Sequence, residues 1–539
     1  MIQMKKTSSA VAIFVLIIQL IVPGMAQLSF NKKSESSNKN ERRIDLIIQK
    51  MTLEEKIDLL GGFDRFYIRD VPRVGIPRMK MADGPVGLRN YGNSNAMPST
   101  ISLASTWNLQ LAESYGRELA RDSRARGVHY LLAPGVNIYR APMNGRNFEY
   151  FGEDPFLTSR FAVNYINGVQ SQNVSATVKH FIANNSEFDR HETDSIIDER
   201  TMREIYLPAF EAAVKEAQVG SIMDSYNLVN GVHTSQSGYL NNEIAKKEWG
   251  FDGVIMSDWR STYDGVAAAN GGLDLEMPAG EYMNRQTLLP AIQQGKVSEA
   301  TIDDKVRRIL RVAARFGWFD HEQTDTSIPL YNAAGRQIAL QTAREGIVLL
   351  KNQGNLLPLD KKKIKAIAVI GPNAYPAITG GGGSSLVEPF NAVSLLEGLA
   401  NIGGLDVKVT YAKGLPTLSE LAEKTNFTVE PNGEAGLRHE YFSNDFLEGT
   451  PDSVRVDNHI NFGSVIRVAT AGPADSSRWT GWFMPKEAGI HDFFVQNTGL
   501  DGGFYRLKVD DNLVINSWED ARAAIGQISL KLDAKPHKI

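Results

Sequence analysis

From residue 45 to residue 318, short apolar runs alternate with stretches of helical periodicity. Five runs predict buried strands, at residues 78–82, 128–133, 175–181, 220–226 and 253–256. Between them, apolar side chains recur every three or four positions, as in Leu111, Tyr115 and Leu119, which predicts helices with one packed face. Repeated strand–helix units over about 270 residues are typical of a triosephosphate-isomerase-type (β/α)8-like barrel. We therefore expect a barrel whose strands end together on one face.

The pattern changes twice beyond the barrel. We expect a linker at 319–333 and the first part of an α/β sandwich domain at 334–415, with strands at 347–350 and 364–370. Short alternating strands separated by Asp-Gly and Asn-Gly turns then fill residues 430–539. This last region is predicted to be all-β, so the chain as a whole is predicted to be multidomain α/β.

The first 26 residues have the layout of a signal peptide. Lys5 and Lys6 precede an apolar run at 10–22, and small residues follow it up to Ala26. The run is shorter than the about 20 apolar residues of a membrane span, although an uncleaved anchor is the alternative. We expect a signal peptide at 1–26, a flexible lead-in at 27–44 and export to the periplasm or the cell exterior.

The composition argues against nucleic-acid binding, cysteine chemistry and membrane insertion. The formal net charge is -4 over 539 residues, so there is no basic excess to neutralise the phosphates of a nucleic acid. The chain has no cysteine, which excludes disulfides, thiolate metal sites and a cysteine nucleophile. No segment after the signal peptide approaches the length of a membrane span. We expect no nucleic-acid partner and no stable membrane insertion after signal cleavage.

Charged and aromatic residues gather where the predicted strands end. They are Asp83, Arg146, Lys179, His180, Tyr226 and Asp258. Any one of them is explained equally well as a solvated or paired rim charge. As a set on one face they are costly to bury unless they pair, and barrel residues that serve stability favour the other face. A carboxylate flanked by cations stays ionised, as a glycosidase nucleophile must, and Trp259 can lie against the apolar face of a sugar ring.

Two other interpretations of the motifs are weaker. His180, His191 and Asp194 offer metal-ligand atoms, but their spacing matches no recognised zinc motif. The glycines at 380–383 follow a predicted strand, but they match neither common nucleotide-binding loop. We expect no metal and no cofactor.

Six linked motifs closely resemble glycoside hydrolase family 3, in its β-glucosidase branch. They lie at residues 82–89, 145–155, 178–181, 184–190, 225–227 and 254–259. The resemblance implies that Asp258 is the nucleophile. It also implies a sugar pocket of Asp83, Arg89, Arg146, Lys179, His180, Arg190 and Tyr226, with Met223 and Trp259 as apolar wall and Ser384 reaching the sugar.

The activity that the resemblance implies is that of an exo-acting retaining β-glucosidase. Its substrate would be a β-linked oligosaccharide or glucoside, and its second carboxyl group would lie about 5–5.5 Å from the first. A β-xylosidase or mixed-specificity glycosidase is the alternative within the same chemistry. A catalytically impaired sugar-binding protein is the alternative outside it.

The all-β region resembles the protective-antigen-type (PA14) β-sandwich inserted in some members of the family. The resemblance therefore implies an α/β sandwich domain interrupted by an all-β insert. In such relatives the acid/base glutamate follows the insert, whereas this sequence ends within it. We expect a C-terminally incomplete chain, with a natural truncation as the alternative, and we name no acid/base residue. The sequence does not indicate an oligomeric state.

Overall fold

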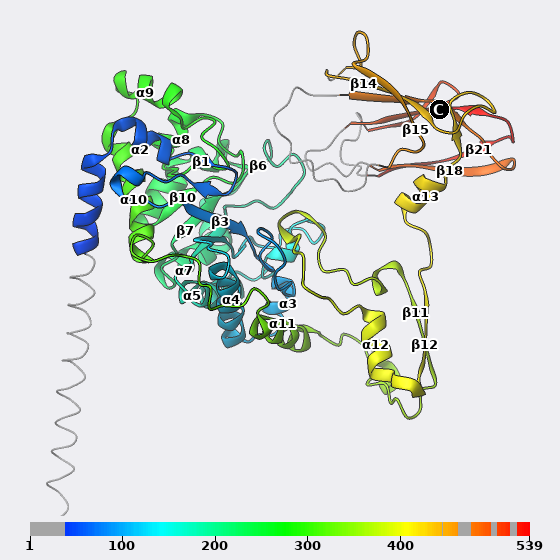
Figure 1. The fold of residues 1–539 in the computed structure, drawn as a ribbon, viewed down its shortest axis with the longest axis horizontal. Helices are drawn as coiled ribbons and strands as arrows, with labels where there is room; N and C mark the ends of the chain where they lie inside the picture. Colours follow the sequence, from blue (N-terminus) through cyan, green and yellow to red (C-terminus); the bar gives the residue numbers. More distant parts are fainter. Residues whose placement is uncertain (1–37, 445, 462–475, 497–503, 518–524) are drawn as a thin grey trace, which may run out of the picture. The chain divides into compact units, whose positions relative to one another are not determined.

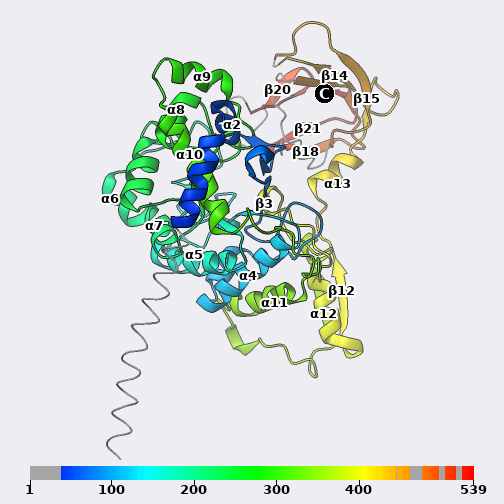
Figure 2. The ribbon, with the colours of Figure 1, turned by 60° about the vertical axis from the view of Figure 1, so that its left-hand side comes forward.

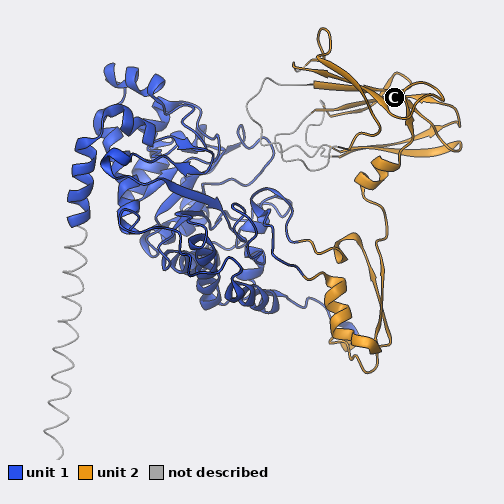
Figure 3. Cartoon of the chain, viewed as in Figure 1, with its two compact units in different colours: residues 1–353, 379–392 blue, residues 354–378, 393–539 orange. Residues whose placement is uncertain are grey.

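The computed structural model describes residues 38–444, 446–461, 476–496, 504–517 and 525–539. Two compact units divide the chain (Figure 3). One contains Met1–Gln353 and Thr379–Ala392, and the other contains Gly354–Ile378 and Val393–Ile539. The signal peptide predicted at residues 1–26 lies outside the described residues. Within the described part of the chain, no helix has the length and apolarity that crossing a membrane requires.

The first unit is built on a sheet that closes into a barrel. Its described strands, in spatial order, are β1 (Gly62–Phe63), β2 (Tyr67–Ile68), β3 (Met79–Asp83), β4 (Tyr130–Leu132), β5 (Ser175–Phe181), β7 (Ser221–Asp224) and β10 (Val254–Met256). From β3 to β10 neighbouring strands are parallel, whereas β2 is antiparallel to both neighbours. Leu275 then pairs with Met256, and Glu276 pairs with Gly61, both in parallel. The predicted barrel is confirmed, with one strand reversed.

Burial explains why the sequence could indicate these strands. All seven residues of β5, and all of β4, β7 and β10, are buried. Parallel strands covered on both faces appear in a sequence as continuous apolar runs, which is the pattern seen at residues 253–256 and, apart from His129, at 128–133. Each of the five predicted runs overlaps an observed strand.

Helices cover the outside of the barrel (Figures 1 and 2). Those of the first unit are α2 (Leu53–Leu59), α3 (Thr100–Ala104), α4 (Leu109–Arg124), α5 (Pro155–Gln170), α6 (Glu199–Thr201), α7 (Pro208–Lys215), α8 (Gly265–Gly271), α9 (Arg285–Gln293), α10 (Glu299–Arg315) and α11 (Ala333–Gly346), with the π-helical segments η3 (Met202–Tyr206) and η5 (Tyr239–Glu248). Glycines allow α4 and α5 to pack closely. A Cβ atom on Gly116 would lie 2.2 Å from the carbonyl oxygen of Tyr165. A helix pair this close leaves no room for a larger residue at that position.

The segment before the barrel differs from the prediction. Residues 38–50 are helical, so the flexible lead-in expected through residue 44 is helical from residue 38. Ile44 and Ile47 are buried, and Glu41 accepts a 2.6 Å hydrogen bond from Nε of Arg311 in α10. The polar composition of the segment concealed this helix, whose isoleucines Ile44, Ile47 and Ile48 are buried on one face.

Part of the predicted second domain belongs to the barrel unit. Helix α11 packs on α3 and α4. The amide of Ser94 donates a 2.9 Å hydrogen bond to the carbonyl of Glu388, which joins the 379–392 segment to the loop after β3. The strand predicted at 347–350 is wrong, because these residues have no regular structure and the Leu350 side chain is exposed. An apolar run becomes a strand only where a neighbouring strand pairs with it.

The second unit begins with a parallel pair, β11 (Ala366–Ile370) and β12 (Lys408–Ala412), accompanied by α12 (Leu395–Gly403) and followed by α13 (Leu418–Lys424). The strand predicted at 364–370 is therefore confirmed. Short strands then follow, which confirms the predicted all-β region. They are β13 (Phe427–Thr428), β14 (Leu437–Phe442), β15 (Ser453–Asp457), β16 (Ser476–Thr480), β17 (Trp482–Phe483), β18 (Gly489–Gln496), β19 (Arg506–Val509), β20 (Asn512–Asn516), β21 (Ile525–Leu532) and β22 (His537–Lys538).

The seam that closes the barrel generates a prediction about stability. A Cβ atom on Gly61 would lie 2.7 Å from Cα of Gly280. Gly61→Ala should therefore lower the free energy of unfolding by about 1–3 kcal/mol, measured by urea denaturation. Gly238→Ala is the matched control, because its new Cβ would meet its nearest neighbour at 3.8 Å. Equal stability of the two variants would show that the seam does not constrain Gly61.

Candidate active site

The barrel brings the predicted polar residues to the face where its parallel strands end. Asp83 is the last residue of β3, and Lys179 lies near the end of β5. Tyr226 follows β7 by two residues, and Asp258 follows β10 by two. In barrels of this type the carboxyl ends of the strands carry the chemistry. Residues far apart in sequence therefore share one site.

Six side chains of alternating charge run across this face. We call them the charge chain, in the order Arg89, Asp83, Lys179, Glu149, Arg146 and Asp258. At one end Nη1 of Arg89 donates a 2.9 Å hydrogen bond to Oδ2 of Asp83. Nζ of Lys179 lies 3.9 Å from Oδ1 of Asp83 and 3.5 Å from Oε2 of Glu149. Each charge thus has an opposite charge beside it, which offsets the cost of burial.

Asp258 stands at the other end of the charge chain. Its Oδ1 accepts a 2.7 Å hydrogen bond from the amide of Trp259. Its Oδ2 lies 3.9 Å from Nη1 of Arg146 and 3.6 Å from Nε2 of His180, and no described residue donates a hydrogen bond to it. The side chain is 9% exposed. One oxygen of a nearly buried carboxylate is therefore held in place, while the other keeps its lone pairs available beside a cation.

His180 is neutral and has a defined tautomer. Its ring is buried, and burial together with Arg146 and Lys179 places its pKa well below the usual range. Nη2 of Arg146 lies 2.7 Å from Nε2 of His180. A guanidinium can only donate, so Nε2 accepts and the ring proton is on Nδ1, 3.3 Å from Oδ1 of Asn137. The approach of His180 to Asp258 is therefore not an ion pair.

Arg190 and Tyr226 form one wall of the site. The Arg190 guanidinium lies 3.8 Å from the centre of the Tyr226 ring, and its Nη1 donates a 2.9 Å hydrogen bond to Oε2 of Glu187. Burial, and next the Asp258 carboxylate, raise the pKa of the Tyr226 phenol well above its usual value. Tyr226 therefore stays protonated near the Asp258 carboxylate.

Apolar side chains complete the wall. The Trp259 ring packs on Phe66 with centroids 5.0 Å apart. Met223 is buried in β7, in register between Lys179 of β5 and Met256 of β10. The contact with Phe66 places the Trp259 ring against the loop after β1, next to Asp258.

Ser384 reaches the site from the glycine-rich segment. Its hydroxyl donates a 3.2 Å hydrogen bond to Oε1 of Glu149. Gly382 and Gly383 have φ values of 102° and 57°, which an L side chain rarely adopts, so the glycines serve to turn the chain at this point. The segment thus places Ser384 beside the charge chain.

The barrel brings together all the residues predicted for the site, and it adds three that sequence reasoning missed. Glu149 and Glu187 lie inside motifs already recognised, and Asn137 positions His180. The spacing of Arg146 and Glu149 at three residues was an available signal, since such pairs meet on one helical turn. Nothing in the sequence indicated that Glu149 would be fully buried.

The weaker metal interpretation finds no cluster to support it. In the described part of the chain, no group of three His, Asp or Glu side chains is placed to hold a metal ion. Nδ1 of His191 lies 2.8 Å from the Tyr263 hydroxyl instead.

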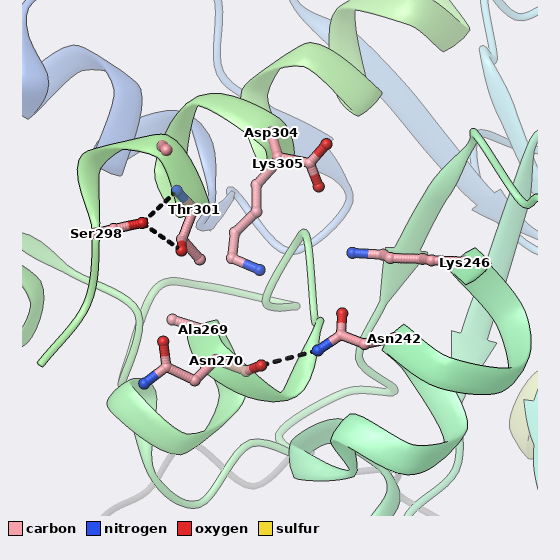
Figure 4. A pocket seen from close by; sticks show the side chains of 9 residues that line it. Asn242, Lys246, Ala269, Asn270, Ser298, Thr301, Asp304 and Lys305 are labelled. Atoms are coloured by element: carbon pink, nitrogen blue, oxygen red, sulfur yellow. Dashed lines mark hydrogen bonds between the residues drawn. The ribbon is translucent and has the colours of Figure 1, made fainter.

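A separate cavity of about 350 Å³ lies between η5, α8 and the start of α10 (Figure 4). Nζ of Lys246 donates a 2.6 Å hydrogen bond to Oδ1 of Asp274, and Nζ of Lys305 lies 4.0 Å from the same oxygen. Asp304 pairs with Nε of Arg308 at 2.8 Å. Lys246 and Asp304 each pair with a neighbouring charge, and no residue lining this cavity belongs to the predicted sugar site.

Comparison with known families assigns the chain to one of them. Residues 19–312 match the model of the glycosyl hydrolase family 3 N terminal domain, and residues 347–477 match that of the C-terminal domain. Residues 433–536 match the PA14 domain. The chain belongs to glycosyl hydrolase family 3, which confirms the predicted family.

Individual relatives carry the name of one activity. A beta-glucosidase of Rhizobium radiobacter is 41% identical over 88% of this chain and 58% of its own length. Beta-glucosidase B of Emericella nidulans is 36% identical over 88% of this chain and 56% of its own length. The chain therefore spans less than two thirds of these relatives.

Solved structures similar to this chain are also named beta-glucosidases. Beta-glucosidase 3B from Thermotoga neapolitana in complex with alpha-D-glucose has a TM-score of 0.64 at 37% identity, over 68% of this chain and 55% of that one. Beta-glucosidase from Kluyveromyces marxianus in complex with glucose has a TM-score of 0.67 at 31% identity, over 92% of this chain and 62% of that one.

The buried Lys305 predicts a pH dependence of stability. Burial, and next the charge of Lys246, lower the pKa of Lys305 from 10.5 to about 7. Between these pH values the unfolded chain binds a proton that the folded chain does not, so the free energy of unfolding rises with pH. From pH 7 to 9.5 this contribution amounts to about 3 kcal/mol at most.

Lys305→Met should abolish this rise, measured by urea denaturation at both pH values. Replacing the exposed Lys296 by Met is the control and should leave the rise unchanged. If Lys305→Met keeps the full pH dependence, Lys305 is charged in the fold at pH 9.5.

Proposed function

We propose that this chain carries the nucleophile and the sugar pocket of an exo-acting retaining β-glucosidase. The observation that carries the proposal is Oδ2 of Asp258, an oxygen near a cation and without a hydrogen-bond donor among the described residues. The relatives are named beta-glucosidases, which supports the activity, and two similar structures are complexes with glucose. The fold alone would not suffice, since barrels of this type host many reactions.

In the proposed first step, a lone pair on Oδ2 of Asp258 forms a bond to the anomeric carbon. The electron pair of the glycosidic bond leaves with the oxygen of the departing group. Arg146 places a positive charge 3.9 Å from Oδ2 without donating a hydrogen bond to it. Water then hydrolyses the ester and restores Asp258. Proton donation to a poor leaving group is the task of an acid/base residue that we do not assign to this chain.

The rest of the site is proposed to bind the sugar. Asp83 and Lys179 form a close acceptor–donor pair that suits the distal hydroxyl groups of a glucosyl unit. Arg146 and Arg190 supply donors nearer to Asp258, and Tyr226 supplies a hydroxyl. Trp259 offers an apolar ring face on which a pyranose can pack.

We also propose how the chain is organised around this activity. Residues 45–318 form the catalytic barrel, 334–415 the start of the α/β sandwich domain and 430–539 the PA14-type insert, with the linker at 319–333. The signal-peptide pattern at 1–26 supports export.

A covalent label tests the nucleophile directly. Incubation with 2-deoxy-2-fluoro-β-D-glucosyl fluoride should add one fluoroglucosyl group, found by peptide mass spectrometry on the peptide that carries Asp258. Fluoride leaves without protonation, so the first step needs no acid/base residue. Asp258→Asn should not be labelled, because an amide is a poor nucleophile at this centre. Asp252→Asn, which removes a nearby exposed carboxylate, should be labelled as the natural chain is.

Circular dichroism of the same samples establishes that the barrel is folded. A folded, unlabelled protein whose Asp258→Ala variant binds glucose as well as the unaltered chain does would contradict the enzyme. The sugar-binding alternative would then replace it.

A further inference from the structure

We infer that Glu149 is a positioning residue that holds Arg146 away from the nucleophile and Lys179 toward the sugar. The inference rests on the proposed function of Asp258. Glu149 belongs to the short 3-10 turn η2 (Asn147–Glu149) and is completely buried. Its place in the middle of the charge chain is what gives it this role.

The contacts of Glu149 reach both halves of the site. Oε1 accepts a 2.6 Å hydrogen bond from Nε of Arg146 and a 3.2 Å hydrogen bond from Ser384. Oε2 lies 3.5 Å from Nζ of Lys179. One carboxylate therefore joins the loop after β4, the end of β5 and the glycine-rich segment, three parts of the chain that are distant in sequence.

The hydrogen bond from Arg146 to Glu149 keeps the proposed nucleophile available. With Nε held by Glu149 and Nη2 turned to His180, Nη1 of Arg146 stays 3.9 Å from Oδ2 of Asp258. Without Glu149, the guanidinium would gain most by moving onto the nearest remaining carboxylate, which is Asp258. A charge-assisted hydrogen bond to Oδ2 would occupy the lone pair that must attack.

The ion pair between Glu149 and Lys179 fixes the position of the Lys179 ammonium at the sugar-binding end of the charge chain. Its ammonium lies between Glu149 and Asp83, at 3.5 Å and 3.9 Å from their nearest oxygens. Loss of Glu149 would leave it with Asp83 alone and would pull it toward β3. The donor and the acceptor proposed for the distal hydroxyl groups would then bind each other more tightly than they bind a sugar.

Glu149 is not suited to donate a proton to the leaving group. Burial acts to raise its pKa, but the charges of Arg146 and Lys179 outweigh burial and lower it. Both of its oxygens face cations or the Ser384 hydroxyl, and none of its surface is exposed. It stays ionised, and its role is carried out through its neighbours.

Glu149→Gln tests the inference, because it keeps the shape of the side chain and removes its charge. The readout is the labelling of the full chain by 2-deoxy-2-fluoro-β-D-glucosyl fluoride, separated into a maximal rate and a half-saturating concentration. We expect the ratio of the two to fall about 100-fold, mostly in the maximal rate, since small misplacements of reacting groups cost about this much. Glu149→Asp keeps the charge and should recover at least about tenfold of the loss.

Two further variants separate positioning from general damage. Ser384→Ala removes one hydrogen bond to the same carboxylate and should cost less than about tenfold. In an Arg146→Ala background, Glu149→Gln should cost less than about tenfold more, because the tethered group is already absent. A residue that only supports the fold would reduce labelling by a similar factor in both backgrounds.

The outcomes are distinguishable. If the unaltered chain is not labelled, the proposed function fails. Suppose instead that the unaltered chain is labelled. If the Glu149→Gln variant is folded and reacts at the same rate, the role of Glu149 fails while that of Asp258 stands. The same holds if the double variant shows the product of the losses from Arg146→Ala and Glu149→Gln. If Glu149→Gln does not fold, Glu149→Asp decides. A residual loss of up to about tenfold in the maximal rate supports the role of Glu149, and labelling at the natural rate contradicts it.

Discussion

The proposed site depends on placing the Asp258 carboxylate beside a cation that does not hydrogen-bond to its Oδ2. A charged group in a buried position needs an opposite charge nearby, yet a close ion pair would tie up the oxygen that is proposed to react. The charge chain meets both demands by placing Arg146 3.9 Å from Asp258 and bonding it to Glu149 instead. Six charges of alternating sign make the arrangement neutral, which is why so many can be buried together.

The barrel is what makes such an arrangement possible. Each parallel strand delivers its last residues to the same face, and burial on both sides fixes the register of strands such as β5. The sheet closes through residues 275 and 276, which joins β10 to the segment before β1. Asp258, two residues after β10, and Asp83, at the end of β3, are therefore held on one rigid support, although about a third of the chain separates them in sequence.

The predictions from sequence succeeded where burial and spacing are local. The five barrel strands could be predicted from the sequence, and Asp83, Tyr226 and Asp258 lie at a strand end or two residues beyond one. The other site residues were predicted from the family resemblance. The prediction failed where tertiary contacts determine the secondary structure of a segment. The run at 347–350 has apolar residues but no strand, and the polar segment from residue 38 is helical because a few isoleucines pack on the barrel unit. Glu149 was missed because its burial depends on Arg146, Lys179 and Ser384, which only the fold brings together.

The most direct test of the central claim is a crystal structure of the chain after reaction with the fluoroglucosyl reagent. The account predicts an ester bond between the anomeric carbon and Oδ2 of Asp258, with the distal hydroxyl groups bonded to Asp83 and Lys179 and with Arg146 still bonded to Glu149. A sugar attached to another carboxylate, or Arg146 hydrogen-bonded to Asp258 in the unreacted protein, would contradict it.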